Sequence, residues 1–417
     1  MKARVYNVAR YVARRWFGPG SSAGHSLAWA GYTIDALQLA EVVDCTLEDL
    51  AEPQQHPERL HPDPSAWVAN WYIPPFESAY YGGVMTILRF ASHMRAQGVR
   101  QRVLICGHAD APAVHAKIVD VFPDLADTEV VALDSATAIA NIPPADISFA
   151  TLWTTAYVLL RVRNAGLKFY FMQDYEPLFY PAGSTYAQAE LTYRFGFYGI
   201  ANTQSIHDIY VNEYGGKAHA IAPCVDTSIF HLPDVARPRA PLRLFYYARP
   251  GTPRNGFELA ACALRRLKTR MRDAVDIDCA GAAWRPEDYG LRGLVNSLGM
   301  LPYRETADLY RRCHVGLVMM MTRHPSYLPF ELMACGALVV SNQNDANRWL
   351  LKSGENCLLA PASATSLAQT LEHALTRWNE HAPLRERAHA GVMEKHAAWP
   401  RELETAFAFV RSVATRA

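Results

Sequence analysis

Short apolar runs alternate with helical periods through most of this chain, and this alternation constrains its fold more than any other feature. From residue 67 onward, the alternation predicts a series of strands with helices between them. The expected strands are residues 67–72, 102–106, 129–133, 146–150, 168–172, 199–201 and 218–221, and two of the expected helices are residues 83–97 and 205–214. Such an order is typical of a parallel, doubly wound sheet with helices on both faces.

A break rich in Pro and Arg, LPDVARPRAPLR at residues 232–243, interrupts this alternation, which then restarts. The second series has expected strands at residues 242–247, 275–280, 315–320 and 337–340 and expected helices at 257–269 and 304–312. A chain of 417 residues also exceeds the size of one ordinary core. We therefore predict an α/β protein with two tandem Rossmann-like domains facing across a cleft. The predicted boundaries are a helical N-terminal extension at 1–60, a first domain at 61–235 and a second at 236–396.

The composition favours a globular enzyme without a strong overall charge. Residues are 50% hydrophobic and 19% charged, and the net charge of +1 gives no reason to expect nucleic acid as a partner. The 8 cysteines are scattered without a C-x-x-C pair, so free thiols in a reducing compartment are expected. The sequence has neither an apolar run long enough for a membrane span nor a recognisable signal-peptide core. We therefore expect a cytoplasmic protein.

Residues 1–20 carry a local excess of positive charge. Five basic residues and no acid occur there, with apolar residues among them at helical spacing. The basic residues are Lys2, Arg4, Arg10, Arg14 and Arg15. One interpretation is a basic amphipathic helix that rests on an anionic membrane surface. The alternative is a helix packed on its own domain, with a solvated basic side.

The segment HPSYLPFELMACGALVV, which begins at His324, has the pattern of an anion-binding loop, helix and strand. A Pro-containing loop precedes a short helix, and an apolar strand follows directly. Such an arrangement directs free backbone N–H groups and the positive end of a helix at an anion. Glu331 lies in the helix, where its carboxylate could bond ribose hydroxyls. Ser326 and Tyr327 in the loop are further candidates for donor binding.

Two other loops at the ends of expected strands carry candidate residues. After the first strand, Gly82 and Gly83 open a helix, where paired glycines let a backbone approach a phosphate or a sugar. Ser78 in the same loop could reach an acceptor hydroxyl. In the second series, Arg249 and Arg254 lie on a loop stiffened by two prolines and could clamp a diphosphate as a leaving group. Solvated loop arginines and a plain Gly-Gly turn are the ordinary alternatives.

The run KFYFMQDYEPLFYPAG places two acids beyond an expected strand. Asp174 and Glu176 would lie at the cleft edge, where a carboxylate can bond sugar hydroxyls or deprotonate an acceptor alcohol. Asp174 is the stronger candidate because it is nearer the strand end. The pair Asp276 and Asp278 could bind a metal ion, but it lies within an apolar strand and a structural role is favoured. The histidines show no metal-ligand spacing, so no metal site is predicted.

Two tandem doubly wound domains resemble the GT-B fold of glycosyltransferases. The run FELMACGALVV, followed by SGENCLLAP, is similar to the signature of glycosyltransferase family four, which comprises retaining enzymes that use sugar nucleotides. In addition, HPSYLPFE, QDYEPLFYPAGSTYAQAE and the Gly-Gly loop together resemble the WsaF-type rhamnosyltransferases, which use dTDP-rhamnose. The resemblance extends from about residue 67 to the tail.

The resemblance implies roles for several residues. The family signature, E-x7-E, would place its first Glu at Arg323, so that acid is absent here, and its ribose-binding Glu at Glu331. Arg249 and Arg254 would hold the diphosphate, with Arg254 at a position where Lys is usual. LGMLPYRE is similar to the family's base-binding loop and has Met300 where a polar residue is common.

The resemblance also implies an activity. We expect a retaining, metal-independent enzyme without a cofactor, which moves a deoxysugar, L-rhamnose from dTDP-rhamnose, to a growing and lipid-linked glycan. The helix at 397–417 would cross back onto the first domain. A UDP- or GDP-sugar donor remains open, as does a non-catalytic subunit of a glycan-assembly complex. A Rossmann dehydrogenase is disfavoured because no G-x-G-x-x-G is present.

Overall fold

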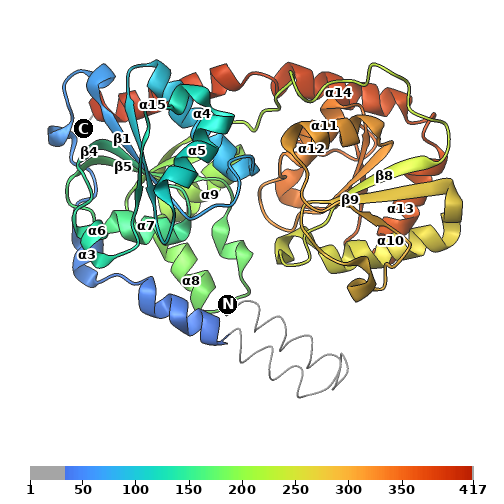
Figure 1. The fold of residues 1–417 in the computed structure, drawn as a ribbon, viewed down its shortest axis with the longest axis horizontal. Helices are drawn as coiled ribbons and strands as arrows, with labels where there is room; N and C mark the ends of the chain where they lie inside the picture. The colour runs from blue at the N-terminus through green and yellow to red at the C-terminus, as the bar shows by residue number, and fades with distance from the viewer. Residues whose placement is uncertain (1–32, 416–417) are drawn as a thin grey trace.

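The computed structural model describes residues 33–415, which form two α/β domains side by side (Figure 1). The first domain contains a seven-stranded parallel sheet in the order β3-β2-β1-β4-β5-β6-β7. Its strands are β1 (Val68–Ile73), β2 (Arg100–Ile105), β3 (Glu129–Ala132), β4 (Ala145–Ala150), β5 (Ala165–Met172), β6 (Tyr198–Ala201) and β7 (Lys217–Ala220). Its helices are α4 (Gly82–Ala96), α5 (Ala111–Val121), α6 (Ala136–Ala140), α7 (Trp153–Leu160), α8 (Ser184–Leu191) and α9 (Gln204–Tyr214).

The second domain contains a six-stranded parallel sheet in the order β10-β9-β8-β11-β12-β13. Its strands are β8 (Leu242–Tyr247), β9 (Val275–Ala280), β10 (Asn296–Ser297), β11 (Val315–Val318), β12 (Leu338–Asn342) and β13 (Leu358–Ala360). Its helices are α10 (Phe257–Met271), α11 (Tyr303–Arg312), α12 (Leu328–Ala334), α13 (Ala364–Thr376) and α14 (Ala382–Lys395). The predicted class, two doubly wound domains, is therefore confirmed.

Each strand expected from the sequence is present, with ends that differ by a few residues. The strands β10 and β13 were not expected, because segments of 2 and 3 residues are too short to show a periodic pattern. Buried apolar side chains cover both faces of each sheet. Full burial on both faces explains why the central strands are nearly continuous apolar runs.

The last helix, α15 (Trp399–Thr415), belongs by its position in the chain to the second domain but packs on the first (Figure 1). Its buried residues recur at helical spacing and join the core that contains β1 and α4. They are Trp399, Leu403, Ala406, Phe407, Val410 and Val413. One apolar stripe on this helix therefore attaches the C-terminal end of the described chain to the first domain.

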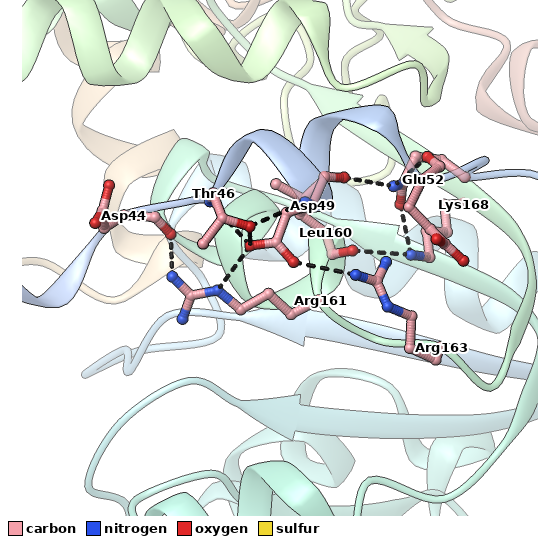
Figure 2. Close-up of polar contacts among 9 residues, drawn as sticks. Asp44, Thr46, Asp49, Glu52, Leu160, Arg161, Arg163 and Lys168 are labelled. Carbon is pink, nitrogen blue, oxygen red and sulfur yellow. Dashed lines mark hydrogen bonds and ion pairs between the residues drawn. The ribbon is translucent and has the colours of Figure 1, made fainter.

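A polar network attaches the segment before β1 to the first domain (Figure 2). Lys168 in β5 is buried, and its ammonium donates to Gln54 Oε1 at 2.7 Å and to the carbonyl of Leu160. Burial lowers the pKa of Lys168 to about 7. Beside it, Asp49 in α3 (Leu47–Ala51) accepts a hydrogen bond from Arg163 at 3.1 Å. This network lies at the amino end of β5, away from the strand ends that carry the candidate site residues.

Within residues 33–415, no helix combines the length and the apolar character that crossing a bilayer requires. The basic segment at residues 1–20 lies outside the described residues, so its membrane contact stays a prediction.

Candidate functional site

A cavity of about 390 Å³ lies between the two domains, at the carboxyl ends of their strands. This volume is within the usual range for small-molecule sites, and this edge of a parallel sheet is the usual place for them. Nine of the residues predicted from the sequence line the cavity together. They are Ser78, Gly82, Gly83, Arg249, Arg254, Met300, Ser326, Tyr327 and Glu331. The fold thus brings residues from four separate loops to one place.

The first domain contributes the amino end of α4. No side chain caps this helix, and residues 81–86 line the cavity. The first N–H groups of a helix have no intrahelical partners, so they are available to an anion there. A Cβ on Gly82 would lie 3.1 Å from Tyr327 Cδ2, and one on Gly83 would lie 3.3 Å from Gln173 Nε2. The two glycines therefore also allow close packing around the helix start.

The second domain contributes two arginines. Arg249 follows β8, and Arg254 lies in the 3-10 helix Pro253–Asn255. The guanidinium of Arg254 packs over the ring of Phe179 from the first domain, 4.2 Å from its centroid. Among the described residues, neither arginine forms a salt bridge with a carboxylate. Burial lowers the pKa of the Arg254 guanidinium, and the Asp174 carboxylate opposes that effect electrostatically without forming a salt bridge with it. Two guanidinium groups at one cavity can hold an anion such as a diphosphate.

A third cation, Arg89, was not predicted from the sequence. It lies on α4, lines the cavity and packs over the ring of Trp399 at 5.1 Å. Its guanidinium is 3.9 Å from Asp226 Oδ2. A single arginine in a helical pattern carries no sequence signal, and only the return of α15 to the first domain brings Trp399 beside it.

Glu331 lies in α12 and faces the cavity without a partner. Within residues 33–415, no side chain forms a hydrogen bond or salt bridge with its carboxylate. Burial raises the pKa of Glu331 to about 8, with no neighbouring charge or hydrogen bond to oppose that effect. A half-buried carboxylate without a protein partner carries a desolvation cost, so its lone pairs are available to a ligand.

The loop before α12 is held in an unusual conformation. Ser326 has φ 67°, in the left-handed region that residues other than glycine rarely adopt. Its backbone N–H donates to His324 Nδ1 at 2.9 Å, and its Oγ accepts from the N–H of Leu328. The next hydroxyl, on Tyr327, bonds Thr86 Oγ1 at 2.7 Å and accepts from Asn202 at 2.9 Å. Tyr327 therefore lines the cavity, and its hydroxyl joins the two domains.

Asp174 lies where the two domains meet, but its carboxylate is not free and it is not among the residues that line the cavity. Its catalytic role stays a prediction. Its side chain is 7% exposed, and Thr322 from the second domain donates to its Oδ2 at 2.5 Å. Its Oδ1 accepts from the backbone N–H groups of Tyr175, Arg323 and His324. The carboxylate is turned towards the facing loop because that loop presents unpaired donors to it.

Glu176 does not line the cavity either, and its catalytic role also stays a prediction. Its side chain is 2% exposed, and its Oε2 accepts from the N–H of Trp153 at 2.6 Å and from the hydroxyl of Tyr170 at 2.8 Å. Trp153 is the first residue of α7, so the carboxylate occupies the positive end of a helix. Burial raises the pKa of Glu176 to about 8.

The remaining candidates have simple placements. Met300 is 50% exposed on the loop that follows β10, at the cavity rim. Asp278, for which a structural role was favoured, is buried in β9 and accepts from Asn296 Nδ2 at 2.9 Å. Across the part of the chain that the structure describes, no three His, Cys, Asp or Glu side chains cluster as metal ligands would.

Two family models match this chain, one for each domain. Residues 70–205 match the N-terminal domain of WsaF, and residues 242–372 match its C-terminal domain. Together they cover more than half of the chain. The chain belongs to the WsaF family. A relative, the O-antigen biosynthesis protein RfbC of Myxococcus xanthus, is 45% identical over 311 residues. That alignment covers 74% of this chain, which spans about a quarter (24%) of the length of RfbC.

Solved structures place this WsaF-family chain in the GT-B fold. HepE (Alr3699) from Anabaena, in complex with UDP and glucose, has a TM-score of 0.65 at 16% identity, covering 83% of this chain and 100% of HepE. Sucrose-phosphate synthase from Thermosynechococcus elongatus has a TM-score of 0.63 at 15% identity, covering 86% and 98%. At such identities the likeness concerns the fold alone. The predicted GT-B architecture is thereby confirmed.

Proposed function

We propose that this WsaF-family chain is a glycosyltransferase, which transfers a deoxysugar from a nucleotide diphosphate to a growing glycan. The observation that carries the proposal is the composition of the interdomain cavity. It combines Arg249, Arg254 and the uncapped end of α4, which suit a diphosphate, with the unpartnered carboxylate of Glu331, which suits a sugar hydroxyl. Family membership and the GT-B fold agree with this function.

The chemistry follows from where the charges lie. The bond between the sugar and the diphosphate breaks, and negative charge grows on the leaving phosphate oxygen. Arg249, Arg254 and the N–H groups of α4 would stabilise that charge. The acceptor hydroxyl attacks the anomeric carbon, and its proton passes to the leaving diphosphate. Because this route needs no protein base, we propose transfer with retention of configuration and without a metal ion.

The proposed donor is dTDP-rhamnose. Its support is the sequence resemblance to the WsaF-type enzymes, together with the absence of the first signature acid at Arg323. The nucleoside of dTDP has only its 3′-hydroxyl to offer Glu331, whereas a UDP-sugar offers two hydroxyls. A UDP-sugar is the alternative donor, because HepE, with the same fold, is described in complex with UDP and glucose.

The proposed acceptor is a polysaccharide or O-antigen-type glycan carried on a lipid. The name of the relative RfbC, an O-antigen biosynthesis protein, supports the glycan. A cytoplasmic location, with residues 1–20 touching the inner face of the membrane, completes the proposal. The charge of that segment supports the contact.

Calorimetric titration with dTDP, UDP, GDP and NAD tests the proposal directly. We expect dTDP to bind most tightly, and Arg249→Ala and Glu331→Ala to weaken that binding and to abolish sugar transfer. Arg348→Ala is a matched control, since Arg348 is exposed and does not line the cavity. Undiminished turnover in both cavity variants would overturn the assignment. Tight dTDP binding by a wild-type protein that transfers no sugar would instead indicate a binding subunit.

A further inference from the structure

The loop that joins β11 to α12, residues 319–327, is held from both domains. From its own domain, Asn342 bonds the N–H and the C=O of Met320, each at 2.9 Å. Asn344 donates to the carbonyl of Thr322 at 2.7 Å, and the backbone carbonyl of Arg254 accepts from the N–H of Met321. These bonds fix the first half of the loop to the second sheet. The loop ends in Ser326 and Tyr327, which line the cavity.

From the first domain, one carboxylate holds the middle of the same loop. Asp174 follows β5, and its Oδ2 accepts from Thr322 Oγ1 at 2.5 Å. Its Oδ1 accepts from the N–H groups of Arg323 at 3.2 Å and His324 at 3.1 Å. Three successive residues of one domain therefore converge on a single side chain of the other. Charge-assisted bonds of this kind are the stronger class of hydrogen bonds.

These bonds leave the carboxylate little capacity for a substrate. Oδ1 accepts three N–H groups, counting that of Tyr175 at 2.8 Å, and Oδ2 accepts the threonine hydroxyl. The side chain is also buried and outside the cavity lining. An acid that orients an acceptor or faces an anomeric carbon must be open to the cavity, and Asp174 is not among the lining residues.

We propose that Asp174 is a positioning residue, which sets the approach of the two domains and the shape of the donor loop through Thr322, Arg323 and His324. Its effect on catalysis rests on the proposed glycosyltransferase function. Two further contacts cross between the domains beside it. The Tyr327 hydroxyl bonds Thr86 and Asn202, and the Arg254 guanidinium packs on Phe179. Asp174 differs from them because it fixes the loop backbone itself.

Two pairs of substitutions separate this role from a catalytic one. Asp174→Asn keeps an oxygen for the three N–H groups and can donate to Thr322 Oγ1, whereas Asp174→Ala keeps neither. Thr322→Ser keeps the hydroxyl, and Thr322→Val removes it from a side chain of nearly the same shape. We expect Asp174→Ala and Thr322→Val to raise the KM for dTDP-rhamnose about 10-fold or more, with kcat within about threefold. The KM and the kcat of Asp174→Asn and Thr322→Ser should both remain within about threefold of the wild-type values.

The inference fails if Asp174→Asn loses kcat as fully as Asp174→Ala, because the charge itself would then act on the reaction. It also fails if Thr322→Val leaves the KM unchanged. The pair Asp174→Ala and Thr322→Val should be non-additive when combined, since both break the same bond.

Small-angle X-ray scattering of the nucleotide-free protein gives a readout that does not depend on transfer. We expect a larger radius of gyration for Asp174→Ala and Thr322→Val than for the wild type, and no change for Asp174→Asn. Equal radii for all variants would overturn the inference. If the wild type transfers no sugar, the proposed function fails, while the scattering result still decides the role of Asp174.

Discussion

Asp174 in the first domain is buried and Glu331 in the second is half-buried; desolvation raises the pKa of both, yet their surroundings differ completely. Asp174 accepts four hydrogen bonds from protein groups, three of them from the facing domain. Glu331 accepts none from the described residues and lines the cavity. A carboxylate that accepts hydrogen bonds from the protein organises structure, whereas one in a cavity without protein donors can bind a ligand.

The largest expected effect is the loss of activity in Glu331→Ala. We expect kcat/KM for the donor to fall at least about 100-fold, or roughly 3 kcal/mol, because the hydrogen bond to the nucleoside is lost. Steady-state kinetics with dTDP-rhamnose measures it. If Asp174→Asn loses kcat/KM to the same degree in the same assay, the distinction between Glu331 and Asp174 is wrong.

The next effect concerns folding rather than activity. Glu176→Ala should lower the free energy of unfolding by about 2–3 kcal/mol, because the Trp153 N–H and the Tyr170 hydroxyl lose their buried acceptor. Urea denaturation measures this loss, and Glu176→Gln, which keeps an oxygen, is the matched control. Because Glu176 lies outside the cavity, kcat of the folded protein should stay within a few-fold of the wild type. A large loss of kcat in a fully folded Glu176→Gln protein would contradict this assignment.

The free energy of unfolding should depend on pH through the unpartnered carboxyl of Glu331. The folded-state pKa of Glu331, about 8, is above its ordinary value of 4.5, so the folded state binds the proton more tightly. Its contribution to stability is complete below pH 4.5 and is lost as the pH rises towards 8. We expect nucleotide-free wild type to lose at least about 2 kcal/mol relative to Glu331→Gln between pH 5 and pH 8. Denaturation of both proteins across that range measures the difference, and a constant difference would mean that Glu331 is solvated.

The smallest expected effect is that of Tyr327→Phe, which tests a second contact between the two domains. Tyr327→Phe removes the hydroxyl that joins Thr86 and Asn202 but keeps the ring at the cavity. We expect a stability loss of about 1 kcal/mol and a KM for the donor raised by less than about fivefold. Thermal unfolding and kinetics measure the two quantities. An effect larger than that of Thr322→Val would assign the main domain contact to Tyr327 instead of Asp174.

Much of the fold could be predicted from the sequence because strand and helix periods are local. The expected strands are present, and the Pro-rich break separates the two series. Candidate residues placed by their loops at strand ends, such as Arg249, Gly83 and Glu331, converge on one cavity because parallel strands end at one edge. Arg89 could not be predicted, since its place in the lining depends on how α4 and α15 pack.

The sequence by itself determined which loops carry the candidate chemistry and which residue types they offer. Only the tertiary structure decided which acids are free. Asp174 and Glu176 lie within three residues of each other in a loop that the sequence predicts at the cleft edge. Each accepts a hydrogen bond from a donor distant in sequence: Asp174 from Thr322 in the other domain, and Glu176 from the first turn of α7. A carboxylate takes the nearest unpaired donors in space, and those are set by domain packing and helix placement rather than by the neighbouring residues in the chain.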